Sequence, residues 1–200
     1  MPAGARARKW TLEEFYAARD AAPGSERWEF VDGEVLVTPG PNTRHQLLIG
    51  RLHLHLAPYV RSHRLGEVLL SPYDVNLEPR RVVVQPDLLV GRRGKGAPDA
   101  ATAAAVLLAV EVISPSSARF DRVVKRPRYQ QNEVPDYWIV DEASETVECW
   151  RPRDERPQIV DDELVWHPDG ASEAFRLGLP AFFAEVDAAY RDFAGEHGAS

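Results

Sequence analysis

The most informative part of this 200-residue sequence is VLLAVEVI, which runs from Val106 to Ile113 and is apolar except at Glu111. A short apolar run of this kind is typical of a strand buried on both faces of a sheet. A second run, VVVQPDLLV from Val82 to Val90, contains Asp87 in a similar setting. An ionised carboxylate removed from water without a partner costs several kcal/mol. Each acid therefore needs a cation, a hydrogen-bond network or an open cleft.

The segments around these two runs predict a mixture of helices and strands. We expect the following order: a capped helix from Thr11 to the residue before Pro23, a hairpin of 28–31 and 34–37, an amphipathic helix between Asn42 and Gly66, strands over 67–77, 81–90 and 106–113, a helix through Lys125 with a kink or restart at Pro127, a hairpin of 137–141 and 146–151, a short strand around 164–166 and a final helix after Pro180. This order is neither a series of hairpins nor a strict βαβ alternation. It predicts an α/β fold with a central mixed sheet flanked by helices.

Length and composition are those of one folded domain. Hydrophobic residues make up 44% of the chain and charged residues 28%, as in ordinary globular proteins. We expect a single domain over 1–200, with its core at about 10–150 and an acidic C-terminal extension over 151–200. The longest apolar run has eight residues, from Ala103 to Val110, whereas about 20 are needed to cross a bilayer, and no apolar signal core begins the chain. The expected location is the cytoplasm, without membrane contact.

The net charge of −7 is unevenly distributed along the chain. Residues 1–79 carry 9 basic and 10 acidic groups, residues 80–130 carry 10 and 4, and residues 131–200 carry 5 and 17. The basic middle could offset the charge of DNA phosphates. Random surface charge explains it equally well, because position along the chain is not position on a face.

Several common kinds of site are excluded or poorly supported. Cys149 is the single cysteine, so neither an intramolecular disulfide nor a thiolate zinc site is expected. The chain has no HExxH, GxSxG or GxGxxG motif, and the glycine-rich segment 91–96 lacks the spacing of a phosphate loop.

The two strand acids predict a metal site if their strands are neighbours. Alternation puts Glu111 on one face with Ala109 and Ile113, and Asp87 on one face with Leu89. Carboxylate oxygens suit hard divalent cations, chiefly Mg²⁺ or Mn²⁺. The alternative is that Asp87 ends its strand in solvent and Glu111 pairs with an arginine.

Three more residues are candidates for the same site. Glu29 could join the acids, although a solvent-facing position in an alternating strand is commoner. The Lys125 ammonium could orient the attacking water and stabilise charge on a phosphate, whereas a surface pair with Asp121 is the structural alternative. His45 lies on the apolar stripe of its helix, where a hydrogen-bonded core histidine is commoner than a ligand or base.

Six segments in this order resemble the Uma-type restriction endonuclease family, a branch of the PD-(D/E)XK nuclease superfamily. They cover about residues 10–150, and they are 28–34, 42–45, 85–87, 110–116, 121–125 and 134–141. The resemblance implies a restriction-endonuclease-like fold and metal-dependent hydrolysis of DNA phosphodiesters. The superfamily acids correspond to Asp87 and Glu111, with 23 residues between them. A homodimer, in which two sites address two strands, is also implied by resemblance.

This chain departs from the superfamily pattern at one position. The superfamily has a lysine two residues after the second acid, and this chain has Ile113 there. The resemblance points to Lys125 as the replacement, and to Glu29 and His45 as further members of the site. The expected catalytic residues are thus Asp87, Glu111, Lys125, Glu29 and His45, and the expected metal ligands are Asp87, Glu111 and Glu29. A noncatalytic binding or scaffold protein with a decayed site, or a phosphoesterase acting on small nucleotides, remains as an alternative.

Overall fold

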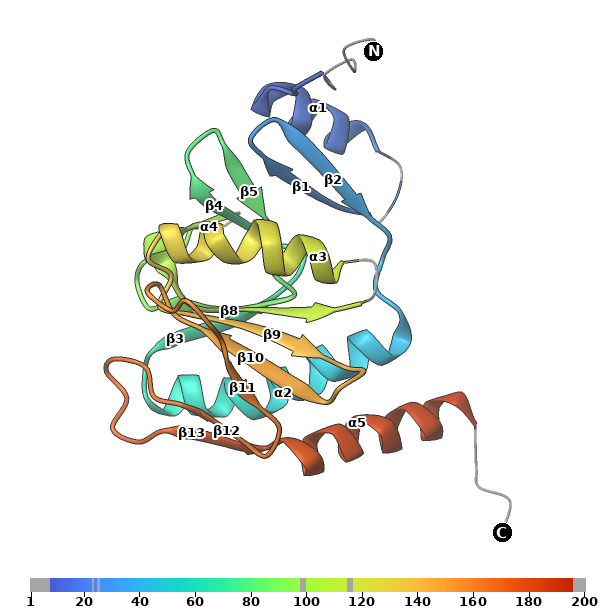
Figure 1. Cartoon of the computed structure of the whole chain (residues 1–200), viewed down its shortest axis with the longest axis vertical. Helices are drawn as coiled ribbons and strands as arrows, with labels where there is room; N and C mark the ends of the chain where they lie inside the picture. Colours follow the sequence, from blue (N-terminus) through green and yellow to red (C-terminus); the bar gives the residue numbers. More distant parts are fainter. Residues whose placement is uncertain (1–7, 23, 25, 98–99, 115–116, 196–200) are drawn as a thin grey trace.

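The structure is a computed structural model that describes residues 8–22, 24, 26–97, 100–114 and 117–195. Its centre is a six-stranded mixed sheet with the order β11-β10-β9-β8-β6-β3 (Figure 1). The strands of this central sheet are β3 (Gly66–Leu70), β6 (Leu88–Arg92), β8 (Val106–Ile113), β9 (Asp136–Asp141), β10 (Thr146–Trp150) and β11 (Gln158–Val160). Strand β8 is buried at every position. It runs antiparallel to β6 and parallel to β9. The predicted α/β fold with a mixed sheet flanked by helices is confirmed.

A second sheet of five strands, the outer sheet, has the order β2-β1-β5-β4-β7. Its strands are β1 (Arg27–Val31), β2 (Glu34–Thr38), β4 (Asp74–Glu78), β5 (Val82–Val84) and β7 (Ala100–Thr102). Strands β1 and β2 form the predicted hairpin, and the outer sheet lies at the end of the molecule that carries the N-terminal helix α1 (Leu12–Ala21) (Figure 1). Helix α1 begins with the predicted capping box of Thr11 and Glu14.

Two predicted strands are wrong because each is split between the two sheets. The segment 67–77 forms β3 in the central sheet and β4 in the outer sheet, and the segment 81–90 forms β5 in the outer sheet and β6 in the central sheet. A proline lies in each break, Pro72 in the first and Pro86 in the second. Proline has no N–H to donate to a strand partner, so the chain leaves one ladder there and joins the other.

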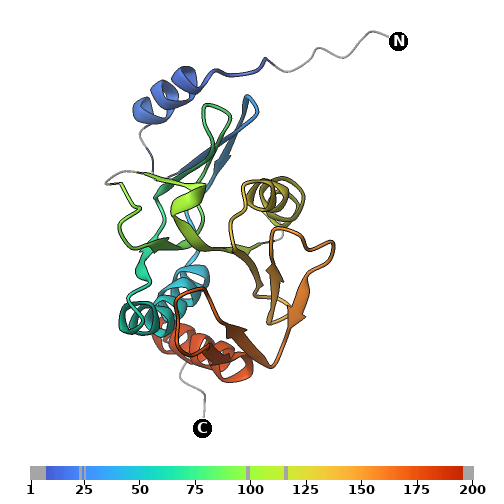
Figure 2. The same ribbon diagram turned by 90° about the vertical axis from the view of Figure 1, so that its left-hand side faces the viewer.

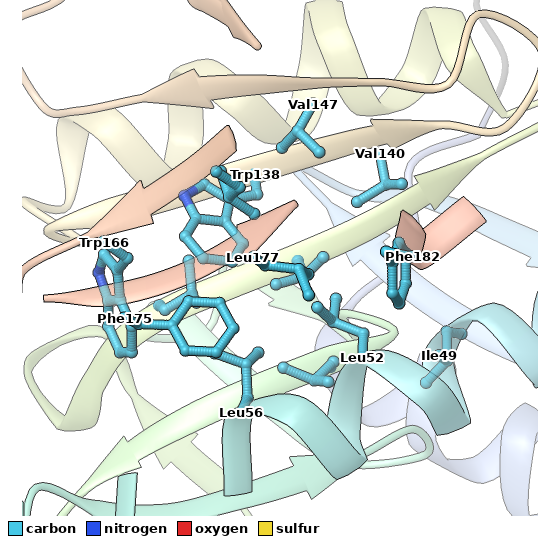
Figure 3. Packing of buried hydrophobic residues seen from close by; sticks show 14 of the residues in the cluster. Ile49, Leu52, Leu56, Trp138, Val140, Val147, Trp166, Phe175, Leu177 and Phe182 are labelled. Carbon is cyan, nitrogen blue, oxygen red and sulfur yellow. The ribbon is translucent and has the colours of Figure 1, made fainter. Parts of the chain in front are cut away.

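Helices cover both faces of the central sheet. Helix α2 (Thr43–Ser62) and helix α5 (Leu179–Ala194) pack together on one face (Figure 2). Helices α3 (Ala118–Phe120) and α4 (Arg126–Gln131), joined by a π-helical segment, Asp121–Lys125, cover the other face. The core beneath α2 and α5 contains these side chains (Figure 3): Ile49, Leu52, Leu56, Trp138, Val140, Val147, Trp166, Phe175, Leu177 and Phe182.

Residues after 150 also contribute side chains to the hydrophobic core. Strands β12 (Glu163–Trp166) and β13 (Phe175–Gly178) form a small separate ladder, and their side chains and those of α5 join the core under α2. The acidic C-terminal segment thus packs against the central sheet. Among the described residues, no helix has both the length and the apolar character that a membrane span requires.

Candidate active site

The acids of the two apolar runs meet where the central and outer sheets adjoin. Asp87 lies between β5 and β6, at the point where the chain crosses from one sheet to the other. Glu111 lies on β8, next to the Leu88–Val110 pair that joins β8 to β6. The backbone N–H of Val112 donates to Asp87 Oδ2 at 2.7 Å. The break at Pro86 therefore turns the Asp87 carboxylate toward β8.

Glu29 approaches the same place from β1 of the outer sheet. Its Oε1 accepts a hydrogen bond of 2.8 Å from the backbone N–H of Gln85. Glu29 is 1% exposed, so the commoner interpretation of its sequence position, an outward-facing strand residue, does not hold.

The Lys125 ammonium joins three carboxylates from three parts of the chain. Its Nζ lies 2.8 Å from Glu29 Oε1, 3.0 Å from Glu111 Oε1 and 3.2 Å from Asp121 Oδ1. The pair with Asp121 exists, but both side chains are buried instead of lying on the surface. Burial lowers the pKa of Lys125, and the three carboxylates outweigh burial and raise that pKa. The raised pKa favours the charged ammonium over the neutral amine.

Lys125 reaches the acids from the π-helical segment Asp121–Lys125. Segments of this type are rare and are frequent at functional sites. The sequence analysis predicted an ordinary helix through Lys125. It named Asp121 as a surface partner of Lys125 and predicted neither its place in the site nor the π-helical geometry.

Arg27 is the second buried cation of the site, and the sequence analysis missed it. Its Nη1 lies 2.5 Å from Asp87 Oδ1, 3.8 Å from Glu111 Oε2 and 3.3 Å from the carbonyl oxygen of Gln85. Arg27 and Glu29 are two residues apart on β1 and so share a face, which is the signal that could have identified Arg27. Burial lowers the pKa of Arg27, and the charges of Glu111 and Asp87 outweigh it and raise that pKa.

His45 lies near the start of α2 and contacts the cluster at Asp87. Its Nε2 is 3.4 Å from Asp87 Oδ1, and its Nδ1 is 3.9 Å from Glu142 Oε1. The N-terminus of α2 is held by Asn42, whose side chain accepts from the N–H of His45. The structure thus brings all five predicted site residues together, and it adds Arg27 and Asp121.

The resulting cluster, called the acidic site below, contains more acids than cations. Its members are Glu29, Asp87, Glu111, Asp121, Arg27, Lys125 and His45. Four carboxylates meet two permanently charged cations. Glu29 Oε2 and Glu111 Oε2 are buried without a hydrogen-bond partner. An unpaired buried oxygen of this kind is costly to a folded protein.

Two carboxyls of the acidic site have shifted pKa values of opposite sign. Burial raises the pKa of Glu111 well above its ordinary value, despite the nearby Lys125. Burial acts in the same sense on Asp87, but the hydrogen bond from His45 and the charge of Arg27 outweigh it and lower the pKa of Asp87. Pairs of carboxyls that titrate far apart are common in catalytic sites and also occur in structural ion-pair networks.

Oxygen donors with free lone pairs are the chemistry that hard divalent cations require. In the part of the chain that the structure describes, however, no three His, Cys, Asp or Glu side chains are already arranged to hold a metal ion. Arg27 Nη1 lies between the Asp87 and Glu111 oxygens, and Lys125 Nζ lies between Glu29 and Glu111. The donor set therefore fits a metal in kind, while protein cations hold the positions between the acids.

Apart from Lys125, the cations of the basic middle (80–130) that form ion pairs in the described part of the chain pair with acids outside the acidic site. Arg81 and Arg128 pair with Asp32 and Glu78 beside the β1–β2 turn. Arg122 pairs with Asp141 and Glu148 on the outside of β9 and β10. Residues 92–95 lie at and after the C-terminal end of β6, whereas Asp87 precedes the N-terminal end of that strand.

Comparisons with known proteins agree with this architecture. A protein-family model described as "Uma2: Putative restriction endonuclease" matches residues 12–181. Among solved structures, the crystal structure of a "putative nuclease belonging to DUF820" from Anabaena variabilis ATCC 29413 is similar, with a TM-score of 0.74 and 19% sequence identity over 88% of this chain and 98% of that chain. A search of curated proteins found no match. The match over residues 12–181 shows that this chain belongs to the Uma2 family of restriction-endonuclease-like proteins.

Proposed function

We propose that the protein is a metal-dependent endonuclease that hydrolyses DNA phosphodiester bonds at the acidic site. The observation that supports this proposal best is the convergence of four buried carboxylates on two cations, with one oxygen each of Glu29 and Glu111 left without a hydrogen-bond partner. Buried carboxylate oxygens without a hydrogen bond only add to the cost of a structural ion-pair network. In a site that receives a divalent cation, the same oxygens would serve as ligands.

The proposed metal ligands are Asp87, Glu111 and Glu29. A bound Mg²⁺ or Mn²⁺ would supply Lewis-acid polarisation of the phosphate and stabilise the charge that develops on it. Asp87 is prepared for this role because its low pKa keeps it ionised, and the Val112 N–H fixes its second oxygen.

Lys125 is the proposed electrostatic group of the reaction. Three carboxylates fix its ammonium beside Glu111, where it can orient the attacking water and offset negative charge on the phosphate. His45 is proposed to hold the Asp87 carboxylate in position, since its Nε2 lies 3.4 Å from Asp87 Oδ1.

Nicking of supercoiled plasmid DNA tests the proposal. The parent protein should nick the plasmid in Mg²⁺ or Mn²⁺ and stop when a chelator is added. Asp87→Asn should lose nicking while it still binds DNA, because DNA affinity depends mainly on phosphate contacts. Glu34→Gln, at an exposed position of β2, is the matched control and should nick at the parental rate. Equal rates for Asp87→Asn and the parent would disprove the proposal.

A noncatalytic binding protein with a decayed site is the second candidate. Two observations favour it: Ile113 occupies the position where the resembling superfamily has lysine, and no group of described side chains is prearranged around a metal. Calorimetric titration with Mn²⁺ separates the two candidates. A folded protein that takes up no Mn²⁺ at millimolar concentration would support the binding protein.

A further inference from the structure

We propose that Arg27 is an internal counter-cation that holds the position between Asp87 and Glu111 and must be displaced before a divalent metal binds there. The inference rests on the proposed metal site and concerns a positioning residue, because Arg27 acts through the two acids.

The position of the guanidinium is the first argument. Arg27 Nη1 lies 2.5 Å from Asp87 Oδ1 and 3.8 Å from Glu111 Oε2, so a single nitrogen faces one oxygen of each acid. Asp87 Oδ1 also lies 3.4 Å from His45 Nε2, and Glu111 Oε2 has no hydrogen-bond partner. Asp87 Oδ2 is taken by the Val112 N–H, and Glu111 Oε1 is taken by Lys125. A divalent cation held by Asp87 and Glu111 would meet the guanidinium, because Arg27 Nη1 faces an oxygen of each acid.

The second argument is that Lys125 is held more firmly than Arg27. Lys125 is 1% exposed, forms ion pairs with three carboxylates and donates a hydrogen bond to Glu111 Oε1. The Arg27 side chain is 18% exposed, and Glu111 Oε2 has no hydrogen bond from it. Arg27 also reaches Thr38 Oγ1 through Nε at 3.4 Å, on the neighbouring strand β2. Arg27 can thus turn outward toward solvent, whereas removal of Lys125 would take the ammonium away from three buried acids.

Charge balance is the third argument. The acidic site has four carboxyl groups, Glu29, Asp87, Glu111 and Asp121, and two permanent cations, Arg27 and Lys125. Exchange of the guanidinium for a divalent ion adds one positive charge beside these carboxyls, next to Glu111 Oε2, which has no hydrogen-bond partner. The exchange is therefore favourable when metal is present, and Arg27 limits the cost of the acids when metal is absent.

Calorimetric titration of Mn²⁺ into the full-length protein tests this inference without any nuclease assay. Arg27→Met removes the competing charge and keeps an unbranched side chain, so Mn²⁺ should bind about tenfold more tightly than to the parent. Arg27→Lys keeps a cation and should bind Mn²⁺ with nearly parental affinity. Arg19→Met is the matched control, because Arg19 pairs with Asp74 on β4 and should not affect Mn²⁺ affinity.

Each outcome has a distinct meaning. Parental or weaker Mn²⁺ affinity in Arg27→Met would overturn the role of Arg27 and leave the proposed function intact. Folded parent and variants that all fail to bind Mn²⁺ would overturn the proposed metal site, and this inference with it. Should Arg27→Met not fold without metal, circular dichroism during Mn²⁺ titration decides: recovery of the fold supports the inference, and its absence at saturating metal for both Arg27→Met and Arg27→Gln overturns it.

Discussion

Lys125 Nζ lies 3.0 Å from Glu111 Oε1 although the two residues belong to different elements of the fold. Ile113, two residues after Glu111 on the same strand, packs with apolar side chains at 6% exposure. The amine next to the acid therefore comes from the π-helical segment that covers β8, not from β8 itself. The contact joins the helical layer to the centre of the sheet.

Replacement of Lys125 should cost stability because it leaves three carboxylates buried without their ammonium. In the metal-free protein, Lys125→Met should lower the free energy of unfolding by about 3–5 kcal/mol, as when one partner of a buried ion pair is removed. Urea denaturation followed by circular dichroism measures the change. Lys95→Met, at an exposed position, should stay within about 0.5 kcal/mol of the parent. A Lys125→Met variant as stable as the parent would show that the carboxylates are not held by the ammonium.

Replacement of His45 separates a polar role from simple packing. His45→Ala removes the contact with Asp87 Oδ1 and should lower the free energy of unfolding by about 1 kcal/mol, the typical net value of a hydrogen bond. His45→Gln keeps an N–H donor of similar reach and should recover part of that loss. Thermal unfolding of both variants provides the measurement. If glutamine is no better than alanine, His45 only fills space.

The sequence indicated the acids of the site because of a local conflict. Asp87 and Glu111 interrupt apolar runs, and burial of an unpaired carboxylate is so costly that its presence signals a compensating group. The same reasoning did not extend to Arg27, because a cation at the start of a strand has an ordinary surface alternative. Asp121 was assigned to a surface pair for the same reason. Which of several charged residues turns inward depends on the packing of layers that are distant in the sequence.

The two split strands show a second feature of the fold that the sequence could not predict. Apolar pattern and length cannot separate one long strand from two short strands that pair in different sheets. The sheet order places β5 beside β1 and β6 beside β8, and Pro86 lies between them. Proline indicated an edge, a bulge or a break at this position, and the long-range pairing decided among these possibilities. The Asp87 carboxylate is directed by this break, so the detail that was missed in the fold is also the one that builds the site.

Asp136 provides a test of pH dependence away from the acidic site. Its Oδ2 accepts from Trp166 Nε1 at 2.9 Å, and burial raises its pKa above the ordinary value despite that bond. A carboxyl whose pKa is raised by folding stabilises the protein fully below its unfolded pKa of about 3.9, and this contribution is lost as the pH rises through the folded pKa. Asp136→Asn keeps an oxygen acceptor and does not titrate. The stability of the parent relative to Asp136→Asn should therefore fall as the pH rises above about 4.

Urea denaturation of both proteins at several pH values gives this difference. Arg151 Nε lies 3.3 Å from Asp136 Oδ1 and acts against burial by lowering the pKa of Asp136. If the stability difference stays constant or rises with pH, burial does not control the pKa of Asp136.

Helix α5 carries a matched pair of phenylalanines that tests whether the acidic C-terminal segment is part of the core. Phe183 is 1% exposed and belongs to the cluster beneath α2, whereas Phe193 is 74% exposed near the end of the same helix. Phe183→Ala should lower the free energy of unfolding by about 3–5 kcal/mol because it removes a buried ring and leaves a cavity. Phe193→Ala should change it by less than about 0.5 kcal/mol.

Tryptophan fluorescence and circular dichroism should report one coincident urea transition in both variants, since Trp138 of the central sheet and Trp166 of β12 lie in the same cluster. A Phe183→Ala variant with an unchanged Trp138 environment and an unchanged urea midpoint would mean that α5 folds apart from the sheet that carries the acidic site.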